Sequence, residues 1–301
     1  RHAFHTKEVA TAAELYSSVL ATDPENSALL QRTFFALIAS GQSGEAVKIA
    51  ERLLAKNPRD SVAGILLALD RIRAGDYKAA LTKISKASRS RLNALVIPLI
   101  EAWSQVGADD TEAGLKALNA LNRRKAYRLF KNYHMALIND FAGNADGAEK
   151  GYQLAIAQRA GASLRSIEIY GSFLERHDRG EEALSLYRDL LERDVDNPLM
   201  LEAVARVESG GKADRQIENA VQGTAEALHG VASVLVPQNG IEQALLYLNL
   251  ALFLKPDFPA AQSLLGGVYE TQRRWKAANK VYDTINPSSA YGWNARIRMA
   301  S

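Results

Sequence analysis

A spacing of 34 residues recurs along this chain of 301 residues, and it constrains the fold more than any other feature of the sequence. Pro24 and Pro58 are 34 residues apart, and each is followed by a new pattern of helical type. The same interval separates two pairs of alanines, Ala46/Ala80 and Ala244/Ala278. A fixed period of about 20–50 residues is the signature of stacked supersecondary units, so we expect a repeat array without a single closed core.

Each period divides into two amphipathic segments of about a dozen residues, with apolar residues at the three-and-four spacing of a helix that buries one face. Residues 28–40 and 45–56 are one such pair, joined by a short polar turn. Alanine followed four residues later by tyrosine puts a small and a large side chain on one helical face. This pattern occurs at Ala12/Tyr16, Ala148/Tyr152, Ala183/Tyr187 and Ala278/Tyr282. No segment alternates with the period of a half-buried strand, so the sequence predicts an all-α fold of antiparallel helix pairs.

These landmarks resemble the tetratricopeptide repeat family, whose pattern has an apolar–small pair and an aromatic residue in the first helix, then alanine and an aromatic residue in the second. Leu265, Gly266 and Tyr269, followed by Ala278 and Tyr282, fit this pattern. The small residues allow neighbouring helices to approach closely. The resemblance runs through nearly the whole chain and implies a right-handed superhelical solenoid of antiparallel helix pairs.

The period predicts repeats near residues 27–58, 61–91, 93–124, 127–160, 164–196, 225–256 and 259–288. Residues 1–196 are expected to form the first half of the solenoid and residues 225–301 the second half, with both ends inside a repeat, as in an excerpt of a longer array. Residues 197–224 break the register, because the glycine-containing breaker at 209–212 leaves room only for a shortened second helix. This joint is either a bend with a special surface or a decayed repeat whose neighbours still pack.

The residue types that perform most enzyme chemistry are either absent or do not occur in patterns typical of an active site. The chain has no cysteine, which excludes a thiol nucleophile, a zinc finger and an iron–sulfur site. Its five histidines form no metal-binding pair, and no glycine-rich loop is present to hold phosphates. We therefore predict a protein that is not an enzyme and uses no metal or cofactor. The net charge of +3 gives no reason to expect a nucleic-acid partner, and no apolar stretch approaches the roughly 18–20 residues that span a bilayer.

The resemblance implies that defined positions of each first helix line the concave side of the solenoid, where members of the family bind ligands. From residue 28 to 141 these positions are mostly apolar, and a large exposed apolar patch marks a recognition site. We predict a groove for an apolar helix or extended peptide, formed by Gln31, Phe35, Ile38, Ile65, Leu69, Leu99, Trp103, Phe130, Tyr133 and Leu137. Two alternatives remain, a register shifted by one residue or tight winding that buries these side chains against one another. Asp140 ends the series, and the next repeat has Arg165, Glu168, Ser172 and Glu175 at the same positions.

Basic residues gather after the second helices, at Arg89 and Arg91 and again at Arg123, Arg124 and Lys125. Stacked repeats would align them along one edge, where they are able to contact the phosphates of a polyanion. The simpler interpretation, which we favour, is that cations at helix C-termini complement the helix dipole and keep the surface soluble.

Residues 245–259 and 285–293 are similar to segments of long, exported tetratricopeptide proteins of alpha-proteobacteria. This resemblance implies a periplasmic or envelope location. The sequence as a whole predicts a non-catalytic scaffold or adaptor that binds a partner protein or peptide in its concave groove. The alternatives are a regulatory or substrate-binding arm of a larger enzyme or assembly machine, and a polyanion binder that uses the basic edge. The ends of such an array are also able to pair, which would give a homo-oligomer.

Overall fold

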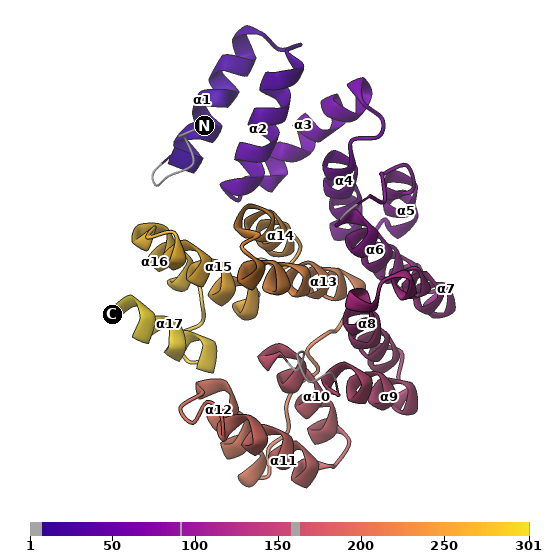
Figure 1. Cartoon of the computed structure of the whole chain (residues 1–301), viewed down its shortest axis with the longest axis vertical. Helices are drawn as coiled ribbons and strands as arrows, with labels where there is room; N and C mark the ends of the chain where they lie inside the picture. Colours follow the sequence, from indigo (N-terminus) through magenta and orange to yellow (C-terminus); the bar gives the residue numbers. More distant parts are fainter. Residues whose placement is uncertain (1–7, 91, 158–162, 301) are drawn as a thin grey trace. The chain divides into compact units, whose positions relative to one another are not determined.

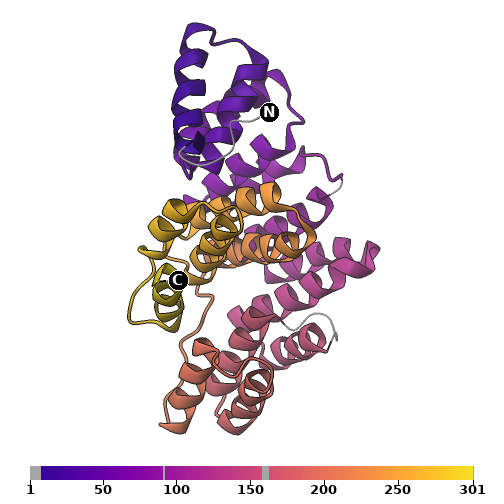
Figure 2. The same ribbon diagram turned by 60° about the vertical axis from the view of Figure 1, so that its left-hand side comes forward.

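A computed structural model describes residues 8–90, 92–157 and 163–300, and every regular element in these ranges is a helix. The predicted all-α fold of paired helices is confirmed. Consecutive helices pack against each other in antiparallel pairs, and neighbouring pairs stack side by side (Figures 1 and 2). The helices form two compact units, unit 1 from Arg1–Ala117 and Ala220–Thr284 and unit 2 from Leu118–Asn219 and Ile285–Ser301. This division differs from the two linear halves expected from the sequence, because the helices of residues 220–284 pack with those of residues 1–117.

The helix ends are encoded locally. Asn26, Asp60 and Asn144 precede helices and accept hydrogen bonds from main-chain N–H groups of the first turn, which have no partner inside the helix. Gly41 and Gly143 follow first helices with φ of 79° and 78°, a left-handed conformation that glycine adopts without steric cost. Short polar turns of this kind fold each helix back on its predecessor.

Unit 1 begins with seven helices and ends with four more, in the order of the chain. The first set is α1 (Glu8–Thr22), α2 (Ser27–Ala39), α3 (Ser43–Lys56), α4 (Ser61–Arg73), α5 (Tyr77–Ser85), α6 (Asn93–Gly107) and α7 (Thr111–Ala117). The second set is α13 (Ala220–Leu235), which continues into the 3-10 turn η3 (Val236–Gln238), α14 (Ile241–Leu254), α15 (Pro259–Thr271) and α16 (Trp275–Tyr282). The pairs α2/α3, α4/α5, α13/α14 and α15/α16 correspond to predicted repeats.

Helices α13 and α14 lie on the inner side of the arc formed by α2, α4 and α6, away from α5 and α7 (Figure 1). Gly223 on α13 lies close against α6, since a Cβ atom there would lie 2.3 Å from the Trp103 ring. The guanidinium carbon of Arg73 on α4 lies 4.2 Å from the centre of the Phe253 ring on α14. The C-terminal helices of unit 1 therefore fill the hollow that its N-terminal helices form.

The described part of unit 2 contains two short 3-10 turns and six α-helices. The turns are η1 (Leu118–Arg123) and η2 (Lys125–Tyr127), and the helices are α8 (Arg128–Phe141), α9 (Ala145–Ile156), α10 (Leu164–Arg176), α11 (Gly180–Leu191), α12 (Pro198–Glu208) and α17 (Ala290–Ala300). Helices α8/α9 and α10/α11 are antiparallel pairs, and α17 packs on α12.

The expected shortened second helix after α12 is wrong. The chain turns at Gly210, with φ of 78°, and residues 211–219 form neither helix nor strand before α13 begins at Ala220. We call residues 211–219 the groove segment. The polar sequence after the two glycines gives no apolar helical face, so this stretch takes its conformation from the surface on which it lies.

Candidate functional site

The residues predicted to form an apolar groove are mostly buried. In unit 1, the exposed fraction is at most 1% for Ile38, Ile65, Leu69, Leu99 and Trp103. Gln31 and Phe35 on α2 are exposed, Phe35 at 42%. Because α13 and α14 cover the inner side of α2, α4 and α6, this strip is an internal packing surface in the structure. Of the two alternatives to an open groove, the one in which these side chains are buried is nearer to the structure. The helices that cover them, however, come from later in the chain. Binding of a partner to this strip stays a prediction.

The three remaining predicted groove residues lie on α8 in unit 2. Phe130 and Tyr133 are each 7% exposed and Leu137 is 2% exposed. Leu137 lines a small pocket together with Ile169 on α10 and Ile217 of the groove segment. This part of the predicted surface therefore adjoins a bound stretch of the chain itself.

The predicted basic edge is divided between the units. Arg89 in unit 1 forms a two-pronged ion pair with Glu101, one nitrogen–oxygen distance being 2.9 Å. In unit 2, Arg123 and Lys125 lie in η1 and η2, and the Arg124 guanidinium carbon lies 5.5 Å from the centre of the Tyr127 ring. Arg91 lies outside the described residues. A polyanion site at these residues stays a prediction.

A more strongly built site lies on the face of unit 2 formed by its first helices, α8, α10 and α12. Asp140 is in the last turn of α8, and Glu175 is in the last turn of α10. Each carboxylate accepts a hydrogen bond from a tyrosine hydroxyl of the following helix, Asp140 from Tyr152 at 3.1 Å and Glu175 from Tyr187 at 2.6 Å. The repeat thus places the same acid–tyrosine pair twice.

An arginine of the next first helix completes each pair. Arg176 on α10 donates to both carboxylate oxygens of Asp140, at 3.2 and 2.6 Å, and Arg206 on α12 donates to both oxygens of Glu175, at 2.9 and 2.8 Å. Two-pronged arginine–carboxylate bonds fix the direction as well as the distance of the groups. They link α8 to α10 and α10 to α12, so they also hold the spacing of the helices that line the face.

The environment keeps Glu175 ionised. Its side chain is 1% exposed, and this burial opposes the charged form, but hydrogen bonds from Arg206 and Tyr187 outweigh the burial and hold the pKa of Glu175 below its ordinary value. Burial and the neighbouring Glu175 carboxylate raise the pKa of Tyr187 far above its ordinary value, so its hydroxyl remains a donor. A buried carboxylate held in this way is a fixed acceptor for a further N–H group.

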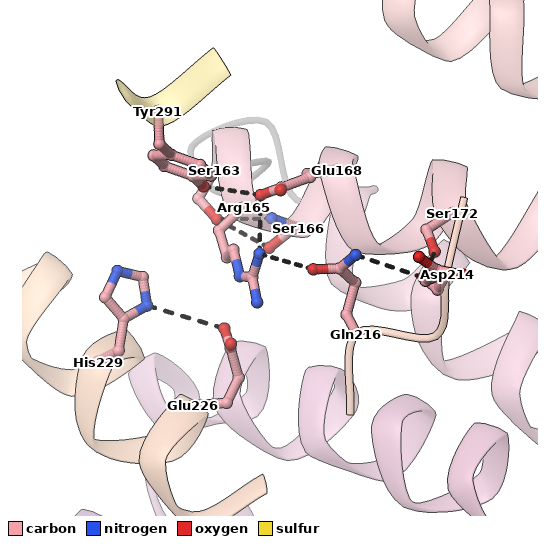
Figure 3. Close-up of polar contacts among 10 residues, drawn as sticks. All are labelled: Ser163, Arg165, Ser166, Glu168, Ser172, Asp214, Gln216, Glu226, His229 and Tyr291. Atoms are coloured by element: carbon pink, nitrogen blue, oxygen red, sulfur yellow. Dashed lines mark hydrogen bonds and ion pairs between the residues drawn. The ribbon is translucent and has the colours of Figure 1, made fainter. Parts of the chain in front are cut away.

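The groove segment supplies that N–H group. The main-chain nitrogen of Ala213 donates to Oε2 of Glu175 at 2.8 Å, and the hydroxyl of Ser172 on α10 donates to the main-chain oxygen of Asp214 at 3.0 Å. Figure 3 shows Ser172 directed at Asp214, with Gln216 beside them. Both bonds are made to main-chain atoms of the segment. They are therefore compatible with many side chains at these positions.

Side chains of the groove segment also contact unit 2. Ile217 is 5% exposed and lines a small pocket together with Leu137 and Ile169. Arg215 donates to the main-chain oxygen of Phe141 at 3.4 Å, with another of its nitrogens 3.9 Å from Asp140. At the edge of the face, Lys212 pairs with Asp178 at 2.5 Å. The segment is therefore held at both ends and in the middle.

A polar chain adjoins the segment on α10. Arg165 donates to Gln216 at 3.4 Å and to Glu168 at 2.9 Å, and Glu168 accepts from the Tyr291 hydroxyl of α17 at 2.8 Å (Figure 3). These bonds tie the groove segment, α10 and α17 together within unit 2.

The repeat register placed Asp140, Ser172 and Glu175 on the inner face, but no sequence pattern assigned them a role. A signal was present, since Asp140 and Glu175 are 35 residues apart and each stands 12 residues before its tyrosine. The position of residues 211–219 could not be predicted, because only the fold brings them to this face.

Among the described residues there is no group of three or more histidine, cysteine, aspartate or glutamate side chains able to hold a metal ion. His134 and His229 are buried, and Nδ1 of His229 lies 3.7 Å from Glu226 in unit 1, as the separate pair in Figure 3 shows. Within the same residues, no helix has the length and apolar character needed to cross a bilayer.

The fold and the groove together define the class of molecule. It is an array of paired helices, and its inner face holds an extended stretch of chain. Residues 3–69 match the model of the tetratricopeptide repeat family, so this part of the chain carries such repeats. Comparison with curated proteins gives no match.

Several solved structures have a similar arrangement of helices. Yeast Tom70 is 15% identical, with a TM-score of 0.47, and a chain of the APC/C hetero-tetramer Cut9–Hcn1 is 14% identical, with a TM-score of 0.41. The matches cover 98% and 97% of this chain but only 58% and 53% of those chains, so this chain spans little more than half their length. A tetratricopeptide repeat protein from Parabacteroides merdae is 12% identical over 91% of this chain and 99% of its own, with a TM-score of 0.44.

Proposed function

We propose that the chain is a non-catalytic protein-interaction scaffold and that the inner face of α8, α10 and α12 binds an extended segment of a partner protein. Tetratricopeptide repeats generally serve as protein–protein interaction modules, and helical arrays of this kind offer long concave binding surfaces. The observation that carries the proposal is the main-chain recognition of the groove segment by Glu175 and Ser172. A surface that already holds one extended chain in this way has the groups needed to hold another.

The chemistry of the face supports binding rather than catalysis. Its carboxylates are each engaged by a tyrosine and an arginine, so they are fixed acceptors and poor proton carriers. A role as the regulatory or substrate-binding arm of a larger enzyme or assembly machine uses the same surface, and it is the second candidate.

Selection of peptides from a random display library on the full-length chain tests this proposal. Ser172→Ala removes the same hydrogen bond from the groove segment and from a peptide that takes its place, so its effect is measured in a chain that also carries Ala213→Pro, which weakens the hold on the segment. In that chain, enriched peptides should lose about fivefold in affinity when Ser172→Ala is added. Phe35→Ser, which changes an exposed residue of unit 1, is the matched control and should bind them as wild type does. Equal affinity of the Ala213→Pro chain with and without Ser172→Ala would place the binding surface elsewhere.

The location of the protein is a separate proposal. The similarity of residues 245–259 and 285–293 to exported alpha-proteobacterial proteins supports an envelope or periplasmic location. Fractionation of source cells tests it, and recovery of the chain only with cytoplasmic markers would contradict it.

A further inference from the structure

The groove segment has the features of a ligand that happens to be part of the same chain. It has no helix or strand of its own, and the groups that fix it belong to α8, α10 and their loops. Two of its bonds are made by main-chain atoms, and one aliphatic side chain, Ile217, is 5% exposed and forms part of a pocket wall with Leu137 and Ile169. These are the elements of extended-peptide recognition, in which main-chain bonds give affinity and pockets give specificity.

Charge complementarity shows which peptides the face favours. The segment has two cationic side chains, Lys212 and Arg215, which are three residues apart in the sequence. Lys212 pairs with Asp178, and Arg215 lies 3.9 Å from Asp140. Ile217 follows Arg215 by two residues and is buried where Leu137 and Ile169 also line the pocket. The face therefore suits a basic residue, a second basic residue three positions later and an aliphatic residue two positions after that.

We infer that the groove segment is an internal competitor, and that the partner is an extended, basic peptide with an aliphatic anchor, which must displace the segment in order to bind. The inference rests on the proposed function of the same face. A short flexible tether gives an effective concentration of the order of 1 mM. If the untethered segment binds with a Kd of about 0.1 mM, the tether weakens binding of an outside peptide about tenfold.

The probe is a fluorescein-labelled peptide with the sequence of residues 211–219, titrated with the full-length chain and followed by fluorescence anisotropy. Two variants release the segment in different ways. Arg215→Ser with Ile217→Ser removes two of its side-chain contacts, and Ala213→Pro removes the N–H group that donates to Glu175. Val195→Ser is the control, because this residue of unit 2 is 69% exposed and lies outside the groove segment and the helices that hold it.

Both released variants should bind the probe about tenfold more tightly than wild type, and Val195→Ser should bind it as wild type does. A probe in which serine replaces the arginine and isoleucine should not bind any of them. Equal binding of the intact probe to wild type and to the released variants would overturn the competitor role while leaving the peptide-binding function standing. No binding to either released variant, with helical content unchanged by circular dichroism, would overturn both.

Discussion

At the scale of single residues, the strongest feature of unit 2 is a buried carboxylate with a complete set of donors. Glu175 accepts hydrogen bonds from Tyr187, Arg206 and the main chain of Ala213. Removing its charge leaves a guanidinium without its partner in a half-buried site, which costs more than the carboxylate contributes in isolation. This residue therefore links the stability of the array to the shape of the groove.

Glu175→Gln should lower the free energy of unfolding by roughly 2–4 kcal/mol at pH 7. Because the pKa of Glu175 in the folded chain is below its ordinary value of 4.5, its contribution is present above pH 4.5 and is lost as the pH falls through the folded value. Urea titrations between pH 3 and 7 should therefore show the gap between wild type and Glu175→Gln narrowing in acid. Glu182→Gln, which changes an exposed partner of Arg179, is the control and should have little effect. A gap that widens as the pH falls would contradict the assignment.

Two tryptophans of unit 1 differ in burial and give a matched pair. Trp103 on α6 is completely buried, whereas Trp275 on α16 is 59% exposed. Trp103→Glu should cost more than about 4 kcal/mol, because it removes a large apolar side chain and buries a charge. Trp275→Glu should leave stability nearly unchanged. Thermal unfolding followed by circular dichroism measures both, and a stable Trp103→Glu chain would mean that the inner face of α6 is open to solvent.

At the scale of helices, the sequence predicted more of the fold than of the contacts. The repeat pattern located pairs such as α2/α3 and α15/α16, because capping residues, turn glycines and apolar spacing are local signals. It also put Ile65, Leu69 and Trp103 on the inner face. What covers that face could not be predicted, since Gly223 meets Trp103 across 120 residues of sequence. The groove segment was missed for the same reason, because its conformation depends on Glu175 and Ser172.

The close packing of α13 on α6 should be sensitive to a single methyl group. Gly223→Ala would bring a Cβ atom to 2.3 Å from the Trp103 ring, so the helices must separate, at a cost of about 1–3 kcal/mol. Gly44→Ala on α3 is the control, since nothing lies within 4 Å of its added Cβ atom, and it should be neutral or stabilising by about 0.5 kcal/mol. Chemical denaturation of the two variants compares them directly. Equal stability would mean that α13 does not pack on α6 as the structure describes.

At the scale of the molecule, unit 1 is discontinuous in sequence. Its N-terminal helices leave an apolar inner face that α13 and α14 cover, so neither residues 1–117 nor residues 220–284 should be well folded alone. Co-expressed as separate chains, the two fragments should purify as a complex. Residues 1–117 alone should bind a hydrophobic dye strongly and aggregate. A stable, monomeric fragment 1–117 with little dye binding would contradict this account of the unit.

Unit 2 carries the claim about function, and amide hydrogen exchange of the unmodified full-length chain tests it most directly. If the groove segment is seated on α8 and α10, the amide of Ala213 should exchange about tenfold more slowly than in an unstructured peptide, because it donates to a buried carboxylate and the tethered segment is seated about ten times as often as it is released. The amides of Lys212 and Asp214, for which no such bond is described, should exchange faster than that of Ala213. Exchange of residues 211–217 at the rate of a free peptide would contradict the account, because the groove would then hold no extended chain.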